Sequence, residues 1–512
     1  MSTAIENTSG KTKSLRSFPP EVCYQAMKSH DARFDGRFFV GVASTKIYCR
    51  PICRVKLPLF KNCSFHPSAA AAESAGFRPC LKCRPELAPG FAASEASTTL
   101  ARTAARLIED AVAGVGKFDD DLSTIANRIG VTDRHLRRIF QSEFGVSPVQ
   151  YAQTQRLLLA KRLLTDTALP VANVAFASGF SSVRRMNTLF AERYGFAPTR
   201  LRKEADASPS VNSGGQFFTF NLSYRPPYDW DWMLSFFEKR AIPSVEAVVD
   251  GSYRRILRFA RDGESTITGW LQVRHAPTKN SLEIMLSPAF APVIAGVLAH
   301  VKRVFDLHAD PVEISAALGT LAKNANGVRL PGAFDGFELA VRAVLGQQVT
   351  VKAARTLATR FVGAHGEAIA FDIAPPFDGL NYAFPTASKV AQLTQDDIAK
   401  HGIVSARANA IIAIAQKVVS GELDLSPSAS LEAASVALQS IKGIGPWTAH
   451  YIAMRALSWP DAFPPQDVAL LNALELPNTA KGQREADAIA EAWRPWRSYA
   501  VMHLWRSLET NQ

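Results

Sequence analysis

All six cysteines of this 512-residue chain lie within its first 83 residues. Four of them form two close pairs, with three residues inside the first pair and two inside the second: Cys49, Cys53, Cys80 and Cys83. Two close thiolate pairs are typical of a tetrahedral four-cysteine Zn²⁺ site, so the sequence predicts a small zinc domain. The spacing alone leaves open whether this zinc is purely structural. Cys23 and Cys63 have no such partners, and we expect them to be ordinary buried cysteines.

The positive charge of the chain is unevenly distributed. The first 216 residues hold 30 lysines and arginines against 18 aspartates and glutamates, whereas the remainder holds 28 of each, so the net charge of +12 arises entirely from the N-terminal part. This asymmetry favours a basic module that binds a polyanion, although charge alone also fits a solvated basic surface.

Membrane insertion and secretion are not expected from the sequence. No apolar run reaches the roughly 18 residues that a membrane span needs. The N-terminus also lacks the apolar core of a secretory signal. We expect a cytoplasmic, nucleoid-associated protein that acts as a monomer.

The pattern along the chain predicts a multidomain α+β protein, because 47% hydrophobic residues suffice for several cores. We expect helices in the second part, strand-like runs mixed with helices after a polar linker, and helices again to the end. The expected segments are a disordered tail (1–16), the zinc domain (17–90), a helical block (98–203), the linker (206–216), an α/β domain (217–305) and an all-α domain (306–512).

The helical block contains an internal repeat. IFQSEFGVSP (139–148) matches LFAERYGFAP (189–198), and Ala-x3-Gly precedes both copies. A small residue followed by a turn glycine predicts two helix-turn-helix units, with a helical bundle as the alternative. The second helices, about 133–143 and 182–193, carry basic side chains that suit phosphates and guanine edges. The arginines that we expect to bind DNA are Arg134, Arg137, Arg138, Arg184 and Arg185.

The N-terminal half resembles known regulators. IYCRPICR (47–54) and AGFRPCLKC (75–83) are similar to the N-terminal zinc domain of the Ada family, and the helical block resembles AraC-type DNA-binding domains. The resemblance implies that Cys49 removes a methyl group from a DNA methylphosphotriester and is consumed, with Cys53, Cys80 and Cys83 as the other zinc ligands. It further implies a transcriptional activator that binds promoter DNA and acts on RNA polymerase.

The C-terminal half contains LQSIKGIGPWTAHY (438–451), which has the form of a helix–hairpin–helix turn. We expect Gly443 and Gly445 to take positive φ and to bring backbone N–H groups against a DNA phosphate. Asp467 follows two prolines at the start of a later helical run. Its position fits an N-terminal helix cap and also fits a catalytic carboxylate.

This half resembles the HhH-GPD family of DNA glycosylases and, within it, AlkA (DNA-3-methyladenine glycosylase II). The matching stretches are 226–246, 330–349 and 493–505. The resemblance implies a TBP-like α/β domain followed by a helical glycosylase domain that hydrolyses the N-glycosidic bond of alkylated purines such as 3-methyladenine and 7-methylguanine in double-stranded DNA. Asp467 would stabilise the oxocarbenium-like sugar and orient the attacking water.

By the same resemblance, aromatic side chains line the pocket for the flipped base, with core packing as the alternative for each of them: Trp447, Tyr451, Trp505 and Phe236. The residues expected to contact DNA near the lesion are Gly443, Gly445, Thr448, Gln347 and Gln348.

Three departures refine the implied function. Trp447 occupies the position where bifunctional relatives have a Schiff-base lysine, so we expect a monofunctional enzyme. Gln348 replaces the apolar wedge of AlkA. The chain has no cysteine after Cys83, so it lacks the O6-alkylguanine methyltransferase motif of Ada proteins. Two alternatives stay open: a regulator whose glycosylase half has decayed into a DNA-binding module, and an enzyme whose N-terminal modules merely deliver it to DNA.

Overall fold

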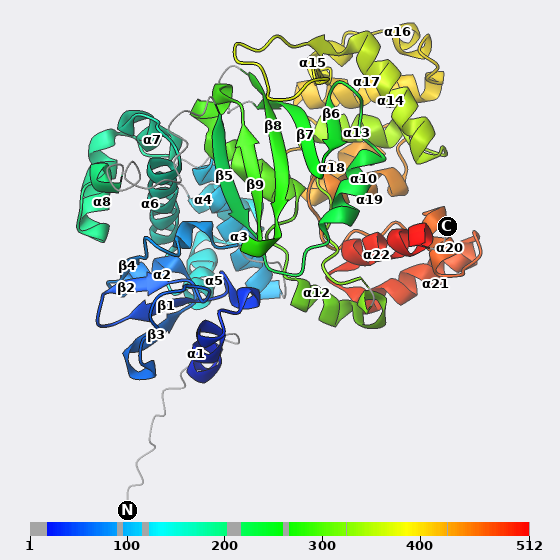
Figure 1. Ribbon diagram of the computed structural model, residues 1–512. Helices are drawn as coiled ribbons and strands as arrows, with labels where there is room; N and C mark the ends of the chain where they lie inside the picture. The colour runs from blue at the N-terminus through cyan, green and yellow to red at the C-terminus, as the bar shows by residue number, and fades with distance from the viewer. Residues whose placement is uncertain are drawn as a thin grey trace, which may run out of the picture.

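The computed structural model describes residues 18–89, 96–114, 122–201, 217–259, 266–323, 325–427 and 429–510. In Figure 1 a five-stranded sheet lies at the centre, with the N-terminal modules on one side and the C-terminal helices on the other. None of the helices in the described ranges is both long and apolar enough to cross a membrane.

The cysteine-bearing module has a four-stranded sheet in the order β3-β1-β2-β4. Its helices are α1 (Pro20–Lys28) and α2 (Ala69–Ser74), and its strands are β1 (Phe39–Val42), β2 (Ile47–Cys49), β3 (Cys63–His66) and β4 (Arg78–Pro79). Strand β2 pairs in parallel with β4, with Tyr48 opposite Pro79. This register brings the end of β2, at Cys49, beside Cys80, whose backbone N–H donates to the Tyr48 carbonyl (3.0 Å).

The helical block confirms the predicted repeat. It comprises α3 (Ala96–Val112), α4 (Leu122–Arg128), α5 (Asp133–Phe144), α6 (Pro148–Asp166), α7 (Val171–Ala177) and α8 (Val183–Tyr194). Thr132 caps α5 and Ser182 caps α8 through their side-chain oxygens. Gly130 and Gly179 make the two turns at φ of +72° and +75°, in the left-handed region that favours glycine.

The central sheet is antiparallel, in the order β5-β9-β8-β7-β6. Its strands are β5 (Phe218–Ser223), β6 (Glu246–Val249), β7 (Ser252–Phe259), β8 (Ile267–Ala276) and β9 (Ser281–Leu286), with α10 (Trp230–Glu238) and α11 (Ile294–Val304) alongside. The runs FFTFNLSY, YRRILRF and SLEIMLS account for β5, β7 and β9, as predicted.

The C-terminal part is helical, as expected, with one addition: β10 (Glu367–Ala368) pairs with β11 (Tyr382–Ala383). Its helices are α12 (Pro311–Leu318), α13 (Gly336–Leu345), α14 (Val351–His365), α15 (Ala387–Val390), α16 (Gln395–Ala399), α17 (Ser405–Ser420), α18 (Leu431–Gln439), α19 (Pro446–Arg455), α20 (Val468–Ala473), α21 (Ala480–Ala490) and α22 (Arg497–Thr510). Short 3-10 helices occur at Ala32–Phe34, Phe60–Asn62, Pro85–Leu87, Pro277–Lys279, Pro288–Val293, Gly319–Ala322 and Glu491–Trp493.

The two halves of the chain pack against each other. Buried side chains of α6, α7 and α8 belong to the same continuous hydrophobic core as those of the central sheet. At the edge strand β5, Arg162 of α6 stacks on Phe220 (5.2 Å to the ring centroid) and donates to the carbonyl of Asn221 (3.1 Å). Ion pairs between Arg303 and Asp110 and between Arg37 and Asp310 also join the halves.

Candidate functional site

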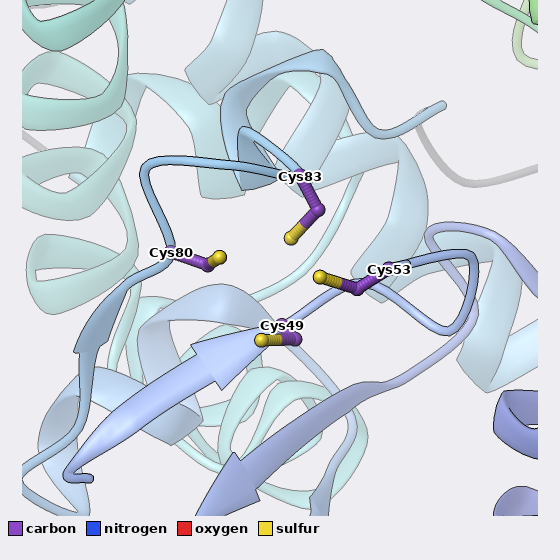
Figure 2. Close-up of side chains that lie close together, drawn as sticks. All are labelled: Cys49, Cys53, Cys80 and Cys83. Carbon is purple, nitrogen blue, oxygen red and sulfur yellow. The ribbon is translucent and has the colours of Figure 1, made fainter. Parts of the chain in front are cut away.

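The four paired cysteines converge on one point. Their Sγ atoms all lie within 4.8 Å of one another, and Figure 2 shows the sulfurs pointing toward a common centre. A zinc ion with tetrahedral Zn–S bonds of about 2.3 Å requires sulfurs about 3.8 Å apart, so the set fits the metal. The predicted zinc ligands Cys49, Cys53, Cys80 and Cys83 are therefore brought together as expected, and they form the zinc site of this module.

Exposure does not favour Cys49 as the nucleophile among the four cysteines. Cys49 is 5% exposed, whereas Cys83 is half-buried. The assignment of the acceptor role to Cys49 thus depends on its position in the motif.

Arg50 forms hydrogen bonds with one of the four clustered cysteines. Its backbone N–H donates to Cys83 Sγ (3.3 Å), and its guanidinium donates to the Cys83 carbonyl (3.1 Å). The same buried guanidinium pairs with Asp35 and reaches the hydroxyl of Ser223 in β5 (3.3 Å). Arg50 therefore links the metal site to β5, the first strand of the central sheet.

Cys23, Cys63 and His66 lie outside this cluster. Cys23 is buried, as expected, and burial raises the pKa of its thiol to about 12, so the thiol stays protonated at neutral pH. Cys63 is only half-buried, which corrects the expectation of a buried cysteine. The His66 Nε2 lies 2.8 Å from the Ser64 hydroxyl.

The five arginines predicted to read DNA lie on α5 and α8, and all five are exposed: Arg134, Arg137, Arg138, Arg184 and Arg185. The apolar side chains on the opposite faces of these helices, including Leu136 and Met186, are fully buried. Arg137 forms an ion pair with Asp133 one turn earlier (3.0 Å), and Arg138 contacts His135. Both second helices therefore present basic faces to solvent.

A large cavity of about 1270 Å³ opens in the C-terminal half. Its walls include the end of α10, helices α13 and α14 with the loop between them, the hairpin and α19, the start of α20, and α22. Asp467, Trp447, Tyr451 and Trp505, all predicted site residues, line it. Large cavities with a few convergent polar groups are typical of ligand sites.

Asp467 caps a helix and also lies at the cavity wall. Its Oδ1 accepts a hydrogen bond from the backbone N–H of Leu470 (2.9 Å), so it caps α20. Its Oδ2 accepts from the indole Nε1 of Trp447 (2.7 Å), at the cavity wall. Asp467 is 7% exposed, and its carboxylate is held by two donors, which fixes its orientation.

The aromatic wall is built from α19 and α22. Trp447 and Tyr451 stack with ring centroids 5.5 Å apart and planes 11° apart, and Trp505 lies 6.3 Å from Tyr451. Arg455 donates to the Tyr451 hydroxyl (2.7 Å), and its charge, together with that of Arg240, lowers the pKa of this phenol although burial opposes the shift.

Phe236 differs from the other predicted pocket residues. It is buried beside the cavity and is not among the described residues that line it. The guanidinium of Arg240 lies 3.7 Å from its ring centroid and that of Arg455 lies 4.8 Å away. The cavity wall at this point is thus formed by Arg240 and Arg455, two residues that the sequence pattern did not reveal.

The hairpin differs in part from the expectation. Gly443 has φ of +95°, as predicted, but Gly445 has φ of −92° and serves as the N-cap of α19, so only one glycine needs the left-handed conformation. Thr448 is only 2% exposed, and its hydroxyl accepts a hydrogen bond from Gln347 (3.0 Å), which does not support a DNA contact by its side chain. Gln348, in contrast, is exposed at the tip of the loop between α13 and α14.

Comparison with protein families matches the chain along most of its length. The metal binding domain of Ada matches residues 22–86, and a helix-turn-helix domain matches 125–204. The AlkA N-terminal domain matches 219–335, which passes the expected boundary at 305, and the HhH-GPD superfamily of base excision DNA repair proteins matches 341–498. Four modules are thus identified in the predicted order.

Individual relatives agree with this division. A probable bifunctional transcriptional activator/DNA repair enzyme AlkA of Mycobacterium tuberculosis (strain H37Rv) is 36% identical over 96% of both chains. DNA-3-methyladenine glycosylase 2 of Escherichia coli K12 is 36% identical and covers 56% of this chain and 96% of its own length. The bifunctional transcriptional activator/DNA repair enzyme Ada of the same organism is 34% identical over 28% of this chain and 38% of its own length. The chain therefore belongs to the family of AlkA proteins that join an Ada-type zinc and helix-turn-helix half to a glycosylase half.

Proposed function

We propose that the C-terminal half is a monofunctional DNA glycosylase that releases alkylated purines, 3-methyladenine and 7-methylguanine, from double-stranded DNA in base excision repair. The observation that carries the proposal is the Asp467 carboxylate, held by Trp447 at the wall of an aromatic cavity beside the hairpin. A hairpin that binds phosphate, a pocket for a flipped base and a carboxylate near the sugar are the parts that base excision requires.

The proposed reaction needs little acid catalysis. A purine alkylated at N3 or N7 is cationic, which weakens its glycosidic bond, and its ring stacks well on electron-rich indole and phenol rings. As the bond breaks, the electron pair leaves with the base and positive charge develops on the sugar. Asp467 Oδ2 would stabilise that charge and accept the proton of the attacking water.

The composition of the cavity supports hydrolysis without a covalent sugar intermediate. Lysine is absent from the described residues that line it, and Trp447 stands at the position of the Schiff-base lysine in bifunctional relatives. The product is therefore expected to be an unbroken strand with an abasic site.

We also propose that the N-terminal half is a stoichiometric methyl acceptor. Zinc bound to the four thiolates would keep them deprotonated at neutral pH. Cys49 Sγ would attack the methyl carbon of a DNA methylphosphotriester, forming a C–S bond while the C–O bond breaks and the phosphodiester anion leaves. The site then loses one of its two formal negative charges, which reduces repulsion of DNA phosphates.

This charge change would convert repair into a transcriptional signal. The exposed arginines of α5 and α8 would bind promoter DNA more tightly after methylation, and RNA polymerase would be the partner of the bound activator. The intact cavity, with Asp467 and its aromatic wall in place, favours this two-function protein over a regulator with a decayed glycosylase half.

A base-release assay tests the glycosylase proposal. Wild-type protein should release alkylated purines from methylated duplex DNA, and Asp467→Asn should lower the rate by about a hundredfold or more. Asparagine caps helices as well as aspartate does, so the variant should keep its fold. Equal rates for the two proteins would contradict the proposal.

For the N-terminal half, the test is transfer of radiolabelled methyl groups from methylated DNA. Cys49→Ser should accept none, whereas Cys63→Ser, outside the cluster, should accept as the wild type does. Equal promoter affinity before and after methylation of Cys49 would contradict the proposed transcriptional signal. The N-terminal modules would then only deliver the enzyme to DNA.

A further inference from the structure

We infer that Gln347 and Gln348 make this protein sensitive to the base opposite its lesion, with Gln348 as the specificity-determining residue and Gln347 as a positioning residue that holds it. The inference rests on the proposed glycosylase function. It starts from the loop between α13 and α14, which borders the cavity and lies against the hairpin.

The amide of Gln347 joins this loop to the hairpin. Its Nε2 donates to the carbonyl of Gly443 (2.9 Å) and to the hydroxyl of Thr448 (3.0 Å), residues about a hundred positions away in the chain. Gly443 is the hairpin glycine with φ of +95°. Because both bonds of Gln347 are made inside the protein, its side chain serves as a brace between the loop and the hairpin.

The loop is also held from its other side. Arg407, near the start of α17, donates a hydrogen bond to the backbone carbonyl of Gln347. Gln347 is therefore fixed by its side chain to the hairpin and by its carbonyl to α17. The backbone of Gln348, the next residue, therefore has little freedom to move relative to the hairpin.

Gln348 has the opposite character. It is exposed and borders the cavity, and no side-chain hydrogen bond is formed by it within the described part of the chain. Its φ of +54° lies in the left-handed region, which is uncommon for a residue other than glycine. The contacts of Gln347 on either side maintain this conformation, and backbone strain of this kind persists where neighbouring contacts impose it.

The chemistry of an amide determines what Gln348 can recognise. An apolar wedge only fills the space left by a flipped nucleotide, whereas a glutamine amide both donates and accepts hydrogen bonds. The partner of a damaged purine is a pyrimidine, and the edges of thymine and cytosine each offer acceptors and donors that an amide can match by rotating. An opposing purine would occupy the volume that the amide needs. Pyrimidines should therefore be preferred in the opposite strand.

Binding to a duplex with a tetrahydrofuran abasic analogue tests the inference without catalysis. Affinities are measured with each of the four bases opposite the analogue. Wild-type protein should bind the thymine and cytosine duplexes about fivefold more tightly than the guanine and adenine duplexes, the effect of one net hydrogen bond. Gln348→Leu should bind all four within about twofold. A wild-type protein that shows no preference would overturn the role of Gln348.

The role of Gln347 is tested by the same preference, expressed as the ratio of affinity for pyrimidine duplexes to affinity for purine duplexes. Gln347→Ala should lose most of the preference, and Thr448→Val, which removes one of the two acceptors, should lose part of it. The preference is a ratio of affinities within each variant, so a change in overall affinity for duplex DNA does not alter it. Gln392→Ala, a change at an exposed glutamine far from the loop in sequence, is the matched control. If Gln347→Ala kept the full preference for opposite pyrimidines and an unchanged melting temperature, Gln347 would not act as a brace.

The opposite-base preference and the base-release activity are measured independently, so one can be contradicted without the other. The analogue has no glycosidic bond, so a wild-type protein that prefers pyrimidines but releases no base contradicts the proposed function and leaves the role of the two glutamines standing.

Discussion

The indole Nε1 of Trp447 donates a 2.7 Å hydrogen bond to Oδ2 of Asp467, whose Oδ1 accepts from the backbone N–H of Leu470. One residue thus forms part of the aromatic wall and also orients the carboxylate. In the proposed reaction, stacking of the flipped base and stabilisation of the sugar would therefore both depend on Trp447.

Trp447→Phe should separate these two contributions. Phenylalanine keeps a ring that can stack on Tyr451 but has no donor for Asp467. Loss of a hydrogen bond to a charged group should lower the single-turnover rate of base release by about tenfold. Trp505→Phe changes another indole of the cavity without touching Asp467, and it should lose less. Equal losses in the two variants would argue against an orienting role for Trp447.

Metal content should follow the four clustered cysteines and no others. Cys80→Ser removes one thiolate of the tetrahedral set, so the purified protein should contain well under one zinc per chain by mass spectrometry of the metal. Cys63→Ser should retain one zinc per chain, since Cys63 lies outside the cluster. Zinc retained by Cys80→Ser would show that three thiolates are sufficient. A chelator that removes the metal should also destabilise the module, because zinc sites of this kind contribute directly to folding.

The arginines of α5 should not contribute equally to DNA binding. Arg134 is exposed, whereas Arg137 is paired with Asp133. Arg134→Ala should therefore weaken promoter binding more than Arg137→Ala and, if it contacts a phosphate, should lower the slope of log K against log salt by about 0.9. Titrations at several salt concentrations measure both quantities. A larger loss in Arg137→Ala would mean that its ion pair opens on DNA.

Stability should depend on pH through Glu73. This carboxyl accepts hydrogen bonds from Tyr48 and Thr154 (both 3.0 Å) and Tyr194 (3.4 Å), and so joins the zinc module to α6 and α8. Burial raises its pKa from 4.5 to about 7. Between these two pH values the folded state keeps a proton that the unfolded state has lost, so the free energy of unfolding should fall as the pH rises, by about 3 kcal/mol in total.

Glu73→Gln tests this expectation. The uncharged amide cannot titrate, so the variant should lose this part of the pH dependence and gain stability relative to the wild type as the pH increases from 5 to 8. Chemical denaturation at both pH values measures the difference. Parallel pH profiles for the two proteins would show that Glu73 stays ionised in the folded state.

Local patterns predicted much of this molecule. The spacing of Cys49, Cys53, Cys80 and Cys83 identified the metal ligands because close thiolate pairs have few other uses in a reducing compartment. The repeat identified the second helix of each unit, since Gly130 and Gly179 make the turns that precede these helices. Asp467 could be placed at the cavity because the helix that it caps begins at the cavity wall.

Contacts between distant segments were not predictable in the same way. The donation from Gln347 to Thr448 spans 101 positions, and no periodicity or motif links the two residues. The same holds for Arg240 and Arg455, which flank Phe236 from different helices. Gly445 fits a hairpin pattern by sequence, yet its conformation is set by the start of α19 rather than by a tight turn.

Helix α6 covers the outer edge of β5, and this contact bears on whether the two halves could be separated. An uncovered outer strand invites pairing with other chains, and natural proteins protect such strands with charges, proline or an overlying element. Here Arg162 and Arg50 supply that protection from the N-terminal half. Gene fission between Leu201 and Phe217 would uncover the outer edge of β5, so a separated glycosylase half would need charges or proline of its own along that strand.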